Sequence, residues 1–306
     1  PLSEARARAF QPDWTQYTPP RPARLGVYKE YPSPATLADY IDWTPFFQSW
    51  QLAGKYPAIL RDDIVGAEAT RLYADAQNML ARIIGENWLE PRAVCGLFPA
   101  NRTAPDDVTL YADETRQTPV ATLYFQRQQL AKAPGLPNLC LADYIAPEGI
   151  PDYMGAFAVT AGVGLEERAR AFEAAHDDYS AILLKSLADR LAEACAEYLH
   201  ERIRREYLGY APDENLDNEA LIAEAYRGIR PAPGYPACPE HSEKITLWRL
   251  LHPNEIGITL TENYAMYPAA SVSGWYMAHP EARYFGLGAI AQDQLEDYAQ
   301  RRASSA

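Results

Sequence analysis

Basic residues are scarce in this chain of 306 residues: 28 Lys and Arg stand against 41 Asp and Glu, which gives a formal net charge of −13. The short basic clusters at residues 202–205 and 301–302 lie beside acidic residues, so the sequence has no basic stripe. Nucleic-acid binders usually carry such a stripe, and anionic membrane surfaces attract one. The sequence therefore predicts no nucleic-acid or membrane partner. Its charge suits a cationic ligand or a basic protein face better.

Long apolar runs and clustered cysteines are also missing. No apolar run approaches the roughly 18 residues of a membrane-spanning helix, and the first residues lack the apolar core of a signal peptide. The cysteines, Cys95, Cys140, Cys195 and Cys238, lie far apart without any CxxC pair. Sparse cysteines of this kind predict reduced thiols and a cytoplasmic location rather than a disulfide scaffold.

Familiar catalytic and metal motifs are absent as well: the sequence has no P-loop, no GxSxG elbow and no HExxH helix. Residues 162–164 read Gly-Val-Gly after an expected strand, as in a dinucleotide-binding loop. The third glycine position holds Glu167, however, and its charge would repel a pyrophosphate. Cys238 and His241 have a metal-ligand spacing but no second pair. We therefore expect neither a catalytic residue nor a metal site.

The composition that remains is that of a globular protein, with 48% hydrophobic and 23% charged residues. Tyr occurs 21 times and Trp 6 times, against only 8 Phe. Rings with a polar tip suit half-buried grooves, so this bias favours a groove binder. Residues 1–35 are rich in Pro and Arg and are predicted to form an arm or linker over the surface, followed by a domain at residues 36–306.

Hydrophobic periodicity indicates helices mixed with antiparallel hairpins. Helices are expected within residues 36–90, with one at 66–84, and at 165–208 and 289–302. Strands are expected at residues 93–98, 108–111, 119–125, 156–160, 246–250, 257–261 and 270–278, the first two being joined by a turn at 104–107. This mixture predicts the α+β class.

The helix expected at residues 165–208 carries two stripes at four-residue spacing. The apolar stripe, which predicts a core-facing side, consists of Leu183, Leu187, Leu191, Cys195, Leu199 and Ile203. The acidic stripe consists of Asp189, Glu193, Glu197 and Glu201. Like charges at this spacing repel one another. The acidic stripe is therefore either a solvated face relieved by neighbouring arginines, or a source of carboxylates placed for a ligand's ammonium or hydroxyl group.

Residues 230–239 read Arg-Pro-Ala-Pro-Gly-Tyr-Pro-Ala-Cys-Pro and are named here the proline ribbon. This proline content excludes a helix or a central strand and predicts a stiff loop with a turn at Gly234. A loop that is already ordered loses little conformational entropy on binding.

The chemistry of the proline ribbon suits S-adenosylmethionine. Its carbonyls can accept from an adenine amine, Arg230 can fork onto a carboxylate, and the Tyr235 ring can face a cation. The alternative is a connector whose Arg and Tyr only pack. An Arg230 guanidinium locked in an internal ion pair would refute the ligand interpretation.

Residues 226–241 resemble the signature of the C-terminal reactivation module of cobalamin-dependent methionine synthase, whose RxxxGY element falls on Arg230, Gly234 and Tyr235. The resemblance continues at residues 40–47, 52–57, 98–102, 128–129, 140–144, 188–193, 270–276 and 283–285, and so spans about residues 12–303. A match of this length is more specific than any single motif.

This resemblance implies a single C-shaped α+β domain, with a bent antiparallel sheet flanked by helices, that binds S-adenosylmethionine in a shallow groove. The matching positions are Asp42, Glu193, Arg230, Ala232, Gly234, Tyr235, Tyr284 and Phe285. By analogy, Arg230 takes the methionine carboxylate, and Glu193 or Asp42 takes an ammonium or ribose hydroxyl group. The Ala232 carbonyl holds adenine, and Tyr235 lies toward cobalamin.

The implied function is reductive methylation of an inactivated cobalamin, as one module of a methyltransferase. The cobalamin is carried by a separate module, and a flavodoxin-like or reductase partner donates the electron. Because a sulfonium is already an activated leaving group, the protein's task is positioning. The chain alone is not expected to make methionine. The alternatives are a non-catalytic S-adenosylmethionine-binding scaffold protein and a structural domain without a ligand.

Overall fold

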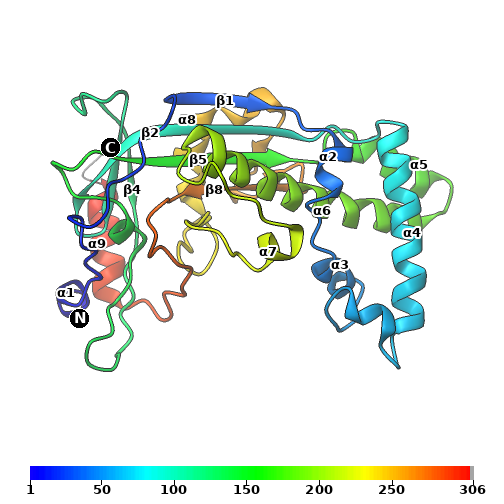
Figure 1. The fold of residues 1–306 in the computed structure, drawn as a ribbon, viewed down its shortest axis with the longest axis horizontal. Coiled ribbons are helices and arrows are strands. Elements are labelled where there is room, and N and C mark those ends of the chain that lie inside the picture. Colours follow the sequence, from blue (N-terminus) through cyan, green and yellow to red (C-terminus); the bar gives the residue numbers. More distant parts are fainter. Residues whose placement is uncertain (304–306) are drawn as a thin grey trace.

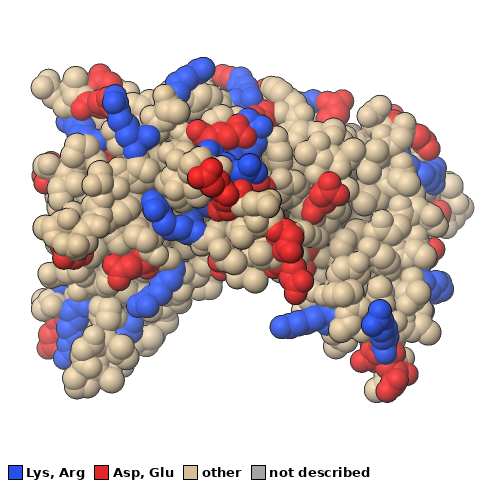
Figure 2. Space-filling model, in the orientation of Figure 1, with Lys and Arg blue, Asp and Glu red and all other residues tan. Residues whose placement is uncertain are grey.

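The computed structural model describes residues 1–303, and Figure 1 shows them as an arch. Helices α3 (Thr44–Ser49) and α4 (Gly66–Gly85) form one leg, and α1 (Leu2–Ala7) and α9 (Gln292–Ala303) lie in the other. The sheet and α6 (Asp178–Arg202) run between the legs, and a hollow separates them in the space-filling view (Figure 2). The structure confirms the predicted single C-shaped α+β domain. The remaining helices are α2 (Pro34–Ala38), α5 (Leu165–Ala174), α7 (Asn218–Ile222) and α8 (Lys244–Leu251).

The main sheet is antiparallel and has the order β4-β3-β2-β5-β8, with β1 also paired to β2. Its strands are β1 (Gly26–Glu30), β2 (Arg92–Ala104), β3 (Asp107–Tyr111), β4 (Pro119–Tyr124), β5 (Asp152–Thr160) and β8 (Ser271–Tyr276). β6 (Thr259–Leu260) and β7 (Met266–Tyr267) form a separate pair. β1 pairs with residues 93–97 of β2, and β3 pairs with residues 100–104. The sheet therefore forks along β2, and a register shift near its end adds to the bend.

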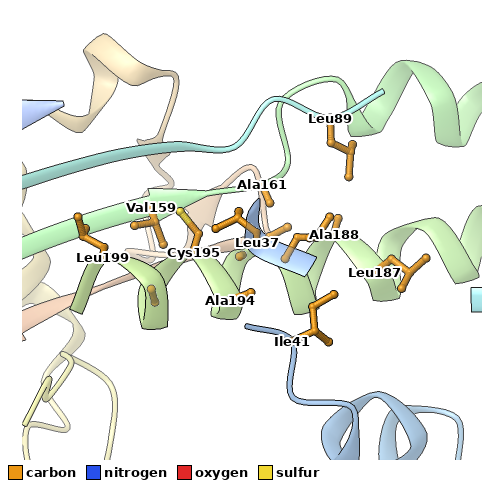
Figure 3. Packing of buried hydrophobic residues seen from close by; sticks show 14 of the residues in the cluster. Leu37, Ile41, Leu89, Val159, Ala161, Leu187, Ala188, Ala194, Cys195 and Leu199 are labelled. Carbon is orange, nitrogen blue, oxygen red and sulfur yellow. The ribbon is translucent and has the colours of Figure 1, made fainter. Parts of the chain in front are cut away.

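Both faces of the central strand β5 are buried, and its residues alternate between two apolar clusters. Phe157 and Val159 belong to the cluster that includes α6, whereas Ala156 and Ala158 face the cluster that includes α8. Figure 3 shows Val159 beside Cys195 of α6. This two-sided packing follows from the two-residue period of a strand. It makes β5 and its neighbour β8 a firm platform for the proline ribbon.

Helix α6 carries the apolar stripe into the core, as predicted: the stripe residues are all buried. The long helix expected at 165–208 is, however, interrupted. His176 has a φ of 59°, and the Asp177 side chain accepts a hydrogen bond from the Ser180 backbone N–H at 3.0 Å, so a new helix begins there. A π-helical turn (Ile203–Tyr207) follows α6. Neither α6 nor another helix within residues 1–303 is long and apolar enough to span a membrane.

Besides the interrupted helix, two further expectations about secondary structure differ from the structure. Residues 246–250, expected as a strand, belong to α8, because Leu247, Leu250 and Leu251 pack into the second apolar cluster at helical spacing. The N-terminal 35 residues also contain more structure than an arm, since they include α1 and the sheet strand β1. The domain boundary at residue 35 stays a prediction.

Candidate functional site

Two adjoining cavities lie between α6, the proline ribbon and the β8 side of the sheet. The larger has a volume of about 530 Å³ and the smaller about 370 Å³. Both are lined by Glu193, Glu224 and Arg230, so they form one continuous groove. The walls of the larger cavity are mainly apolar and include Phe157, Pro231, Ala232, Pro236, Val272 and Phe285. A groove of this kind suits an amphipathic ligand with charged groups at one end.

The proline ribbon is fixed to β8 by backbone hydrogen bonds. Ile229 and Met277 exchange two such bonds, at 2.9 and 3.0 Å, and the Trp275 N–H donates to the Pro231 carbonyl at 2.8 Å. Gly274 permits this close approach, because a Cβ there would lie 2.6 Å from the Pro231 oxygen. The structure thus confirms a non-helical, ordered loop, and it shows that the order comes from β8 as well as from proline.

Gly234 forms the predicted turn of the proline ribbon. Its φ is +95°, and its N–H donates to the Cys238 carbonyl at 2.7 Å. A Cβ at this position would lie 2.3 Å from the His241 ring, so both the conformation and the space favour glycine. Gly234 lines neither cavity, and its part in the site is to shape the loop.

The other predicted site residues all border the groove. Arg230, Ala232, Tyr235, Tyr284 and Phe285 line the larger cavity, Asp42 lines the smaller, and Glu193 lines both. The Tyr284 hydroxyl accepts from the Arg230 backbone N–H at 2.9 Å. Asp42 also accepts from the Thr44 N–H at 3.0 Å, which holds the start of α3 at the groove.

Arg230 is not a free guanidinium. Its Nη2 lies 2.8 Å from Glu197 Oε2, and its Nη1 contacts the Tyr226 hydroxyl at 2.8 Å and His200 Nδ1 at 3.1 Å. The internal ion pair that was named as evidence against the ligand interpretation is therefore present. A guanidinium has five N–H donors, however, so three contacts leave two for a carboxylate. The internal ion pair therefore fixes the Arg230 side chain but leaves two of its N–H donors for a ligand.

Sequence reasoning missed the residues that hold Arg230. His200 gave no signal, and Tyr226 was visible only as the first residue of the matching signature at 226–241, without a role. Burial, with Arg230 and Arg204 nearby, holds the pKa of His200 well below its usual value, so the ring is neutral and can accept through Nδ1. Glu197 was visible as a member of the acidic stripe, without a partner.

The acidic stripe is not the solvated face that was one of its two interpretations. Only Asp189 is exposed, Glu193 lines the groove and Glu197 is buried. Burial raises the pKa of Glu197, although the nearby Arg230 acts to lower it. Figure 2 shows acidic side chains gathered above the hollow between the legs. The stripe thus supplies carboxylates to the groove, as the other interpretation expected.

The groups that line the groove suit the binding of a molecule with several chemically distinct parts. Among residues 1–303, no group of three or more His, Cys, Asp or Glu side chains is placed to hold a metal ion. The groove instead combines apolar walls, the held Arg230 guanidinium and four carboxylates, from Asp42, Glu193, Glu197 and Glu224. These groups can select a molecule that has a planar apolar part, a carboxylate and a cation.

Comparisons with known proteins agree with this geometry. Residues 34–303 match the family model described as "Vitamin B12 dependent methionine synthase, activation domain". The chain is also similar to the solved crystal structure of the MetH reactivation domain bound to AdoHcy, with 56% sequence identity and a TM-score of 0.96. That similarity covers 99% of this chain and 94% of the other.

Proposed function

Since the chain belongs to the family of activation domains of vitamin B12-dependent methionine synthase, we propose that its groove binds S-adenosylmethionine and presents the methyl group to cobalamin. The observation that carries the proposal is the groove itself: Arg230, the carboxylates and the apolar wall meet in one continuous cavity. The structural relative is described as bound to AdoHcy, which is S-adenosylmethionine without its methyl group.

The proposed roles follow from the contacts left open in the groove. The two remaining N–H groups of Arg230 bind the methionine carboxylate. Glu193 or Asp42 receives the ammonium or a ribose hydroxyl group. The Ala232 carbonyl already accepts from the Tyr235 N–H at 3.2 Å, and its second lone pair can take the adenine amine. Tyr235, with 59% of its surface exposed, lies at the open side of the groove, toward cobalamin.

The protein's own contribution to methyl transfer is to bind and orient the donor. Cobalamin, carried by a separate module, would supply the metal-centred nucleophile, and a flavodoxin-like or reductase partner the electron. The sulfonium sulfur leaves as a neutral thioether, so no side chain of this chain has to donate a proton. Under this proposal the domain binds S-adenosylmethionine alone but makes methionine only with the other modules.

Titration calorimetry tests the proposal with a charge-specific prediction. S-adenosylmethionine carries one more positive charge than S-adenosylhomocysteine, so the acidic groove should bind the former more tightly. Glu193→Gln is expected to reduce that preference about threefold to tenfold, because a nearby carboxylate contributes roughly 1 kcal/mol at partly exposed distances. Asp189→Asn, one turn earlier on α6 and outside the groove, is the matched control. Equal affinity of the wild-type protein for both ligands would contradict the assignment.

A second prediction concerns the close contact between the proline ribbon and Gly274 of β8. Gly274→Ala places a Cβ against the Pro231 oxygen, so the ribbon must shift away from β8. We expect the free energy of unfolding to fall by about 1–3 kcal/mol and the affinity for S-adenosylmethionine to fall about tenfold. Gly85→Ala, where no atom lies within 4 Å of the added Cβ, is the control. Denaturant unfolding and calorimetry on both variants give the answer. Unchanged binding by Gly274→Ala would show that ligand binding does not depend on this contact between the ribbon and β8.

A further inference from the structure

Glu197 lies between two arginines, Arg204, which is fully buried, and Arg230, which is partly exposed to the groove. Its Oε2 is 2.8 Å from Arg230 Nη2, and its Oε1 is 3.9 Å from Arg204 Nη1. Glu197 Oε1 and Arg204 Nη1 are both buried and have no hydrogen-bond partner. Buried polar atoms without partners are costly, so their presence beside a ligand groove calls for a functional reason. One carboxylate is here shared between two guanidinium groups.

On the side away from Glu197, Arg204 is held by Glu214 and Tyr226. Glu214 accepts from Arg204 Nε and Nη2 at distances of 2.6 to 3.0 Å, and the Arg204 guanidinium carbon lies 3.9 Å from the centre of the Tyr226 ring. The same Tyr226 contacts Arg230 Nη1 through its hydroxyl at 2.8 Å. Arg204 and Tyr226 therefore form a rigid back wall for Glu197 and Arg230.

The charges in this cluster balance, because Glu197 and Glu214 offset Arg204 and Arg230. The cluster therefore needs no ligand to be electrically neutral. A ligand carboxylate that reaches the two open N–H groups of Arg230 finds a guanidinium already held in place. Because that side chain has lost its rotamer freedom before binding, the ligand does not have to order it.

We propose that Glu197, although it lines the smaller cavity, is a positioning residue for the donor's carboxylate: it orients Arg230 through the shared ion pair and acts on the ligand only through that guanidinium. Tyr226 and the neutral His200 complete the orientation from the Nη1 side. The inference rests on the proposed function, since it assumes that Arg230 binds the carboxylate of S-adenosylmethionine. It adds that the affinity for the ligand's carboxylate depends on Glu197, which acts through Arg230.

The test compares two ligands that differ only in the carboxylate: S-adenosylmethionine and its decarboxylated form, which keeps the sulfonium and the amine. Glu197→Gln keeps the shape of the side chain but loses the ion pair. We expect it to weaken S-adenosylmethionine binding about tenfold or more, the effect of roughly one charge-assisted hydrogen bond, and to change decarboxylated ligand binding less than about twofold. Glu206→Gln, an exposed partner of Arg202 on the following turn, is the matched control.

Tyr226→Phe is the second variant, because it removes only the hydroxyl that contacts Nη1 and keeps the ring against Arg204. It should show the same ligand split with a smaller loss. Equal weakening of both ligands by Glu197→Gln would overturn the inference, since it indicates a general structural role or direct contact with the amine. Tighter S-adenosylmethionine binding would also overturn it, by making Glu197 a competitor for Arg230. A wild-type protein that binds neither ligand would instead refute the proposed function, and the inference with it.

Discussion

Arg230→Ala is expected to lower the affinity for S-adenosylmethionine about 100-fold or more and to destabilise the domain at the same time. The binding loss corresponds to roughly 2.7 kcal/mol, the worth of one or two charge-assisted hydrogen bonds to the carboxylate. The stability loss arises because Glu197 keeps its buried carboxylate without its nearest cation. Removing one partner of a buried ion pair costs about 3–5 kcal/mol. Calorimetry measures the first effect and denaturant unfolding the second.

The two effects of Arg230→Ala can be separated with a compensated variant. Arg230→Met combined with Glu197→Gln removes both charges, so the free energy of unfolding should recover most of its loss. Binding of S-adenosylmethionine should stay weak, because the guanidinium is still missing. Recovery of both properties in the double variant would show that Arg230 acts through stability alone. It would place the carboxylate elsewhere in the groove.

Local patterns could predict much of the fold. The short apolar runs in β2 and β5 and the helical spacing in α4 are properties of the segments themselves, and the structure confirms strands at the former and a helix at the latter. The errors occurred where the pattern is short or depends on a single residue. The apolar run in α8 fits a helix or a strand equally well, and the end of α5 depends on the left-handed conformation of His176.

The candidate site divides in the same way. The proline ribbon could be recognised because its four prolines lie within ten consecutive residues, and its turn at Gly234 follows from the same segment. The partners of Arg230 could not, since Glu197 and His200 precede it by some thirty residues, on a helix that packs beneath it. Only the packing of α6 under the sheet brings these side chains within hydrogen-bonding distance. From the charge pattern alone, Glu197 could belong either to a solvated face or to a ligand site.

The largest loss of stability is expected far from the groove entrance, from Arg127→Leu. Arg127 is fully buried and binds Asp143 through two nitrogens at 2.7 and 2.8 Å, and Asp106 through Nε at 2.8 Å. It also donates to the Asn138 and Pro105 carbonyls. Leucine leaves both carboxylates and both carbonyls without this donor. We expect the free energy of unfolding, measured with denaturant, to fall by about 5 kcal/mol. Asp143 loses its nearest cation, which alone costs about 3–5 kcal/mol, and the two carbonyls lose a donor, whereas Asp106 keeps its ion pair with Arg6 at 2.7 Å.

Arg102→Leu is the matched control for Arg127→Leu, because Arg102 reaches the same Asp143 only at 3.5 Å and from a partly exposed position. Its expected cost is below about 1 kcal/mol. The damage from Arg127→Leu should also reach the groove. The neighbouring Gln128 donates to the Gly286 carbonyl at 2.7 Å, beside the wall residue Phe285. Weakened S-adenosylmethionine binding by Arg127→Leu, and not by Arg102→Leu, would link this leg of the arch to the site. Equal free energies of unfolding for Arg127→Leu and Arg102→Leu would contradict the prediction. They would mean that water solvates Asp106 and Asp143 in place of Arg127, and that the ion pairs of Arg127 do not stabilise this leg.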